Sequence, residues 1–163
     1  MPLRHALEKK MVKLLEIITN QKIIAIVAGT IIILSLSIPW VSFSILTKDY
    51  KFVNYNVTPF FLRITNPNLN EPSKIEWLYQ NDATTLGVIT VVTGFTGIFN
   101  GFKKKKRLLL LSGAVSLISV ILFPSTLPGW FLKMRIDTGI FFSSIGSLLL
   151  VYGGLLSEKP SNI

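Results

Sequence analysis

The chain has 163 residues, of which 50% are hydrophobic, and its mean hydropathy of +0.55 is too high for a soluble domain of this size. The formal net charge is +9, but the cations cluster beside apolar runs, so they indicate topology and contact with anionic lipid rather than a nucleic-acid partner. Cysteine is absent, which excludes disulfides and thiolate metal ligands. We therefore expect an all-α integral membrane protein, a bundle of four transmembrane helices.

The N-terminal segment 1–22 has an amphipathic pattern. Its apolar residues recur at steps of three and four, and its cations occupy other directions: Leu3, Leu7, Met11, Leu14 and Ile18 against Arg4, Lys9, Lys10 and Lys13. Two interpretations stay open. The segment is either a basic amphipathic helix on the cytoplasmic leaflet or an extension of the first span into water.

Four apolar runs predict the transmembrane helices, at residues 23–46, 84–102, 108–123 and 136–156. Pro39 falls near the outer end of the first run, where we expect it to end or bend the helix. The run 136–156 is followed by a short polar tail, residues 157–163.

The connection 47–83 is polar and rich in aromatic residues. Residues 50–57 and 60–65 are both strand-like, with Thr58-Pro59 between them, and this pattern predicts a small β-hairpin between the first two helices. The stretch 65–73 is expected to be irregular, and residues 75–79 a short interfacial turn. The second connection, 124–135, is short.

Five adjacent cations separate the second and third apolar runs, in the turn 103–107. Short cation-rich loops stay in the cytoplasm. We therefore expect a multi-pass protein of the cell membrane with both termini cytoplasmic and the connections 47–83 and 124–135 outside. The turn is also a candidate site for lipid headgroups, although it could serve as a topogenic signal alone: Lys103, Lys104, Lys105, Lys106 and Arg107.

The three tryptophans all fall on the outer side in this topology, so we expect them at the membrane interface: Trp40, Trp77 and Trp130. The tripeptide Asn56-Val57-Thr58 is an N-glycosylation sequon in the outer connection, which makes Asn56 a candidate acceptor.

Glycines recur at helical spacing in the second and fourth runs: Gly87, Gly94, Gly97 and Gly101, and then Gly139, Gly146 and Gly153. Small residues let helix backbones approach closely inside a bilayer. We expect these stripes to pack the bundle. The alternatives are a face directed at a partner subunit or a second copy, and a glycine-lined pore.

Apart from Asp137 at the outer edge of the fourth run, the four apolar runs contain no Asp, Glu, Lys, Arg or His. This pattern argues against proton relays, ion-coupled transporters and voltage sensors. A single histidine, His5, and no cysteine cannot build a haem or catalytic metal site within the chain. We therefore expect no catalytic, cofactor-binding or metal-binding residue, and no enzymatic activity.

The layout of four spans, internal termini, a large first outer connection and a short second one resembles the claudin-like tetraspan proteins. Trp40 after the first span and Trp77 late in the first outer connection agree with that likeness. The Gly-Leu-Trp signature and the paired loop cysteines of that family are missing, so the resemblance assigns no functional residue.

Together these features predict a non-catalytic protein that acts by association of its helices and its outer segment. It would be a structural or accessory subunit of a membrane complex or a self-assembling scaffold. The partners would be membrane lipids and other membrane subunits or copies of the same chain. The alternative is a small oligomeric channel or carrier with a path lined by Ser, Thr and Gly.

Overall fold

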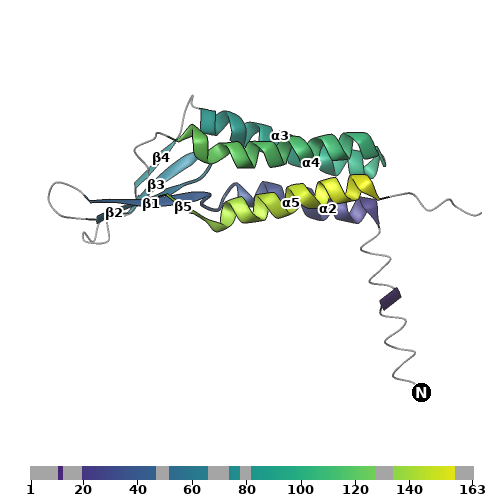
Figure 1. Ribbon diagram of the computed structural model, residues 1–163, viewed down its shortest axis with the longest axis horizontal. Helices are drawn as coiled ribbons and strands as arrows, with labels where there is room; N and C mark the ends of the chain where they lie inside the picture. Colours follow the sequence, from purple (N-terminus) through teal and green to yellow (C-terminus); the bar gives the residue numbers. More distant parts are fainter. Residues whose placement is uncertain are drawn as a thin grey trace, which may run out of the picture.

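The computed structural model describes residues 11–12, 20–46, 52–65, 74–77, 82–127 and 134–156. Within these residues, four helices lie side by side and a five-stranded antiparallel sheet extends from one end of them (Figure 1). We call this the sheet end. The opposite end, which carries the turn between α3 and α4, is called the basic end.

The helices are α2 (Gln21–Ser35), α3 (Asp82–Phe102), α4 (Lys106–Leu122) and α5 (Thr138–Leu155), and the short 3₁₀ helix η1 (Phe123–Thr126) continues α4. Each helix packs against two others, α2 and α4 each contacting both α3 and α5. Three of these described helices are long and apolar enough to cross a membrane, whereas α2 is a shorter apolar helix. The expectation of long apolar helices is thereby confirmed for α3, α4 with η1, and α5.

The strands are β1 (Val41–Leu46), β2 (Phe52–Val57), β3 (Phe61–Thr65), β4 (Lys74–Trp77) and β5 (Arg135–Ile136), in the spatial order β4-β3-β2-β1-β5. Strands β2 and β3 form the predicted hairpin. The Thr58 hydroxyl stabilises its turn, because it accepts from the Phe61 amide (3.0 Å) and lies 3.0 Å from the Phe61 carbonyl oxygen. The all-α expectation was wrong, because a sheet accompanies the helices.

The first helix ends earlier than expected. Hydrogen bonds from Leu36, Ser37 and Ile38 to carbonyls three residues back tighten the chain after α2. The residue before a proline avoids helical conformation, so Pro39 stops the helix. The Trp40 amide then donates to the Val57 carbonyl (2.8 Å), which starts the β1–β2 ladder. The predicted helix over 23–46 is therefore wrong for 41–46, which is a strand.

Two further boundaries differ from the prediction. Residues 74–77 form strand β4 rather than an interfacial turn, since they pair with β3. The helix expected from residue 136 begins at Thr138, because Arg135 and Ile136 pair with β1. The predictions for 1–22 and 157–163 fall almost entirely outside the described residues.

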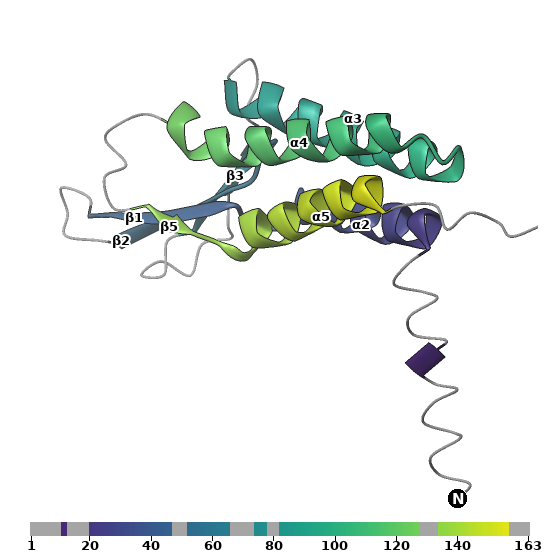
Figure 2. The same cartoon turned by 45° about the vertical axis from the view of Figure 1, so that its right-hand side comes forward.

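One face of the sheet is part of the hydrophobic core at the sheet end. Alternate residues of β1 and β2 are buried there, with Trp40 and with Phe123 from η1: Val41, Phe43 and Val57. Strands β1, β2 and β5 lie beyond the end of α5 (Figure 2). Side chains alternate across a strand, so the intervening residues of β1 and β2 lie on the opposite, open face. The sheet is thereby fixed to the helices through one face only.

The turn at the basic end is a helix C-cap. Lys104 has a φ of 51°, the Lys105 amide donates to the Asn100 carbonyl (2.9 Å) and the Lys104 amide donates to the Gly101 carbonyl (3.3 Å). This pair of bonds is the Schellman arrangement, which ends α3 and reverses the chain into α4.

Candidate functional site

Buried hydroxyl groups line the contacts between the helices. Ser147 Oγ on α5 lies 2.8 Å from Ser116 Oγ on α4, and Ser112 Oγ on α4 lies 3.2 Å from Oγ1 of Thr96, an exposed residue of α3. Most of these hydroxyls also donate to a carbonyl one turn back in their own helix, as Ser112 does to Leu108 (2.8 Å). Such bonds satisfy the hydroxyl without a ligand. The Ser143 hydroxyl alone among the described buried hydroxyls has no hydrogen-bond partner.

No ionisable side chain is buried among the described residues. The part of the chain that the structure describes also contains no cluster of three or more His, Cys, Asp or Glu residues that could hold a metal ion. The helical interior therefore offers hydroxyl groups and glycine backbone, without an evident acid, base or metal-ligand set in the described ranges.

Five of the seven glycines singled out from the sequence lie buried between helices. A Cβ on Gly101 would meet Ala25 of α2, one on Gly97 would meet Leu150 of α5, and one on Gly146 would lie 2.8 Å from the Ala28 carbonyl oxygen. Gly94 and Gly153 occupy similar positions against α2, with Leu109 of α4 also beside Gly153. These contacts are within one chain, which favours bundle packing over a face directed at a partner.

The other two glycines lie against the segments around the sheet. A Cβ on Gly87 would lie 2.6 Å from Pro59 Cβ in the β2–β3 turn. At Gly139 it would lie 2.7 Å from the carbonyl oxygens of both Ile38 and Pro39, and the Gly139 amide donates to Pro39 O (3.0 Å). These glycines connect the helices to the sheet end.

Sequence reasoning missed three glycines with equally close contacts: Gly29, Gly113 and Gly154. Gly113 shares a face with Ser112 and Ser116, and this run of small residues was the signal that could have identified it. A Cβ on Gly113 would lie 2.8 Å from the Ser147 carbonyl oxygen.

The tryptophans have different environments. Trp40 is completely buried, its Nε1 donates to the Ser35 carbonyl (2.9 Å), and its ring meets Phe123 edge-on. The chain turns into the core at Pro39, so Trp40 packs inside the protein, and its expected place at the membrane interface stays a prediction. Trp77 on β4 is 61% exposed, and Trp130 lies outside the described residues.

The basic turn is exposed at the end of the molecule where α2 begins and α5 ends (Figure 1). Lys103 Nζ lies 4.2 Å from the centroid of the Phe99 ring, and Lys22 Nζ lies 4.5 Å from that of Phe102. The charged heads thus lie over exposed aromatic rings of α3, an arrangement suited to a boundary between apolar and aqueous surroundings.

The open face of the sheet is polar and cationic. A single row of directly paired residues crosses all five strands on this face: Arg135, Ser42, Asn56, Arg63 and Ile75. Both arginines are exposed. Lys74 and Glu76 form an ion pair (2.6 Å), and the hydrogen bond to Glu76 raises the pKa of Lys74. These two residues flank Ile75 on β4, so their side chains lie on the other face of the sheet. The paired strand residues on the open face therefore include two cations and no acid, and Asp137 follows Arg135 by two residues beyond the end of β5.

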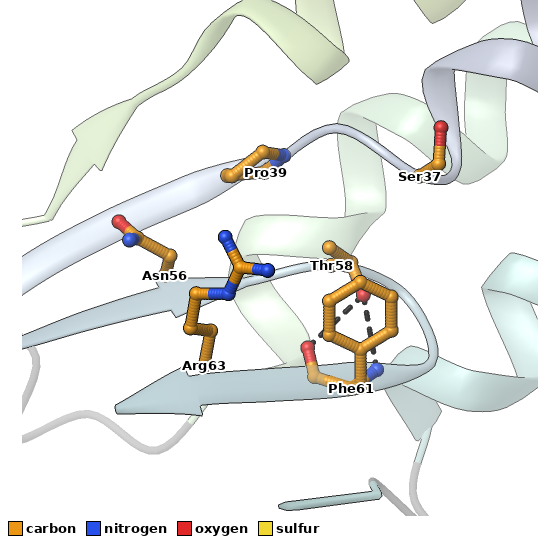
Figure 3. Close-up of a pocket in the computed structure, with 6 residues that line it drawn as sticks. All are labelled: Ser37, Pro39, Asn56, Thr58, Phe61 and Arg63. Carbon is orange, nitrogen blue, oxygen red and sulfur yellow. Dashed lines mark hydrogen bonds between the residues drawn. The ribbon is translucent and has the colours of Figure 1, made fainter. Parts of the chain in front are cut away.

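A small cavity lies where this face meets the end of α2. It has a volume of about 50 Å³ and is lined by Ser37, Pro39, Asn56, Thr58, Phe61 and Arg63 (Figure 3). Arg63 and Asn56 rise side by side from neighbouring strands, and the arginine extends toward Pro39. Neither side chain forms an ion pair or a hydrogen bond with another described residue.

Asn56 is half-buried in the middle of the sheet, between Ser42 and Arg63. Thr58, the third residue of the sequon, is 1% exposed, and its hydroxyl is hydrogen-bonded within the turn. Glycosylation of Asn56 remains a prediction, and it would have to precede formation of this turn.

No protein-family model matches the chain, and a search of curated proteins returns no match. Function is therefore inferred from the contacts described above.

Proposed function

We propose that this chain is a non-catalytic membrane protein with four transmembrane helices that acts by association, as a structural or accessory subunit or as a self-assembling scaffold. In the proposed orientation the basic turn and both termini are cytoplasmic, and the sheet lies outside the cell membrane. The described helices support membrane embedding through their outward surfaces, which carry large exposed apolar side chains, among them Phe95, Phe99, Ile121 and Phe141.

Association is supported mainly by strand β4. This strand ends the sheet, so its outer backbone groups pair with no described strand, and it carries Ile75 and Trp77, which are 49% and 61% exposed. An exposed edge with apolar side chains is a template for strand pairing with another chain. A second copy or a partner subunit would cover both the unpaired backbone and these side chains.

The alternative, an oligomeric channel with a path lined by Ser, Thr and Gly, has less support. Its lining would have to face a shared axis between copies, whereas the side chains of Thr90, Ser116, Ser143 and Ser147 are 0% exposed within one chain. The outward surfaces of the helices are apolar instead, which suits lipid or a dry helix contact.

The test is the mass of the protein after purification in a mild detergent. We expect a species heavier than one 18.2 kDa chain, either a multiple of it or a stoichiometric complex with a second subunit. Ile75→Lys should reduce that species to one chain, because a lysine on an edge strand opposes strand addition. Thr65→Lys is the matched control, since it places the same charge on the same face of the sheet but on the inner strand β3.

A wild-type monomer with no bound chain would contradict the proposal. Equal loss of association in Ile75→Lys and Thr65→Lys would also remove β4 as the contact, because it would point to the added charge alone.

A further inference from the structure

We infer that the cavity between the end of α2 and the open face of the sheet binds the phosphate group of a membrane lipid. The choice of a lipid as the source of that phosphate rests on the proposed membrane orientation. The choice of a phosphate rests on the cavity itself.

The lining has the chemistry that a phosphate requires. Arg63 supplies a planar guanidinium that can donate two parallel hydrogen bonds to a phosphate, and it has no acidic partner among the described residues. The Asn56 amide can donate beside it. The cavity lining contains Arg63 and no acid, so the local potential at the cavity favours an anion.

The size of the cavity fits a headgroup rather than an extended ligand. A cavity needs roughly 10–15 Å³ to hold one water. The volume of about 50 Å³ therefore accommodates a few waters or one phosphate-sized group. The Phe61 ring forms an apolar wall of the cavity. It packs edge-to-face against the Trp77 ring, with 6.2 Å between the ring centroids. A lipid could thus place its phosphate at Arg63 and its glycerol carbons against Phe61.

In the proposed orientation, the cavity lies near the inner limit of the lipid headgroup layer. The β2–β3 turn touches α3 at Gly87, five residues after the first residue of α3, or roughly 7 Å along the helix axis toward the basic end. A headgroup layer is roughly 5–7 Å thick on each side of a bilayer core of about 30 Å. If Asp82 marks the outer aqueous boundary, the turn that lines the cavity lies where the headgroups meet the hydrocarbon.

Native mass spectrometry of the detergent-solubilised full chain tests the inference, with dioleoylphosphatidylglycerol added in increasing amounts. Each variant is made in a parent background that carries Lys103→Gln, Lys104→Gln and Lys105→Gln, so that the basic turn competes less for the lipid. We expect Arg63→Gln to weaken binding of the first lipid about tenfold, the loss typical of a charge-assisted hydrogen bond. Arg135→Gln, which removes the other arginine of the same face, should change it less than twofold.

Two further ligands identify the source of the phosphate. Dioleoylglycerol, which has the same chains and no phosphate, should bind no better to the parent than to Arg63→Gln. Inorganic phosphate should bind far more weakly than the phospholipid. If it binds as tightly, free phosphate is the ligand and the lipid assignment falls.

Equal lipid binding by the parent and Arg63→Gln would overturn the inference, as would an equal loss in Arg63→Gln and Arg135→Gln, which would indicate a diffuse field. Both variants should retain the thermal unfolding curve of the parent. If Arg63→Gln binds the lipid as the parent does while the chain still associates, this inference is rejected and the proposed function stands.

Discussion

Trp40→Ala is expected to lower the free energy of unfolding by about 3–5 kcal/mol, the range for truncating a buried tryptophan or phenylalanine. Trp40 is 0% exposed, and its ring centroid lies 4.9 Å from that of Phe123. The truncation removes this contact, leaves a cavity between β1 and η1, and deletes the hydrogen bond from Nε1 to the Ser35 carbonyl (2.9 Å). Circular dichroism at 222 nm during thermal unfolding in detergent measures the loss without relying on tryptophan fluorescence.

Trp77→Ala is the matched control for that substitution. Its side chain is 61% exposed at the sheet edge, and its ring meets Phe61 alone among the described aromatic rings. We expect less than about 0.5 kcal/mol, as for most surface substitutions. Equal destabilisation by the two substitutions would contradict the placement of Trp40 in the core.

Gly113→Leu should destabilise the helix packing by about 3 kcal/mol, at the upper end of the cost of overpacking. A Cβ at this position would already lie 2.8 Å from the Ser147 carbonyl oxygen, from the Val151 amide nitrogen and from Val151 Cγ2. The two backbone atoms belong to α5 and cannot move aside as a flexible side chain can. Helices α4 and α5 would therefore have to separate along their contact.

The neighbouring Ala114→Leu provides the comparison, because Ala114 is exposed on the same helix turn. It adds the same leucine side chain on the outward surface, where we expect almost no loss of stability in detergent. Thermal unfolding of both variants, followed by circular dichroism, distinguishes them. If Gly113→Leu were as stable as Ala114→Leu, the close contact between α4 and α5 would be refuted.

The long helices could be predicted from sequence because polar residues bound each apolar run. Helix α3 was expected over 84–102 and is Asp82–Phe102, and the cations at 103–107 marked its end. The β2–β3 hairpin was also predictable, since two strand-like runs flank Thr58-Pro59.

Strand β1 could not be separated from α2 in the same way. Residues 23–46 are mostly apolar and contain no charged residue, and a buried strand and a buried helix look alike in such a run. The alternation in Val41-Ser-Phe-Ser-Ile-Leu and the position of Pro39 were the signals that favoured a strand. Without these signals the burial of Trp40 in the core was not predicted, because it depends on the same turn.

The cavity at Arg63 was beyond sequence reasoning for another reason. Arg63 and Asn56 become neighbours only through the register of β2 and β3, and Ser37 joins them only because α2 ends two residues before it. A one-residue change of register would move Arg63 to the opposite face. Hydrophobic pattern alone does not determine which polar residues meet across strands.

The most direct test is the side of the membrane on which each end of the molecule lies. The chain contains no cysteine, so Lys104→Cys in the basic turn and Ser44→Cys on β1, away from the β4 edge, each introduce a single reactive thiol at an exposed position. In intact cells, a membrane-impermeant maleimide should label Ser44→Cys and not Lys104→Cys, and both should react after permeabilisation. Labelling of both thiols in intact cells, or of neither until permeabilisation, would put the basic turn and the sheet on one side and contradict the proposed architecture.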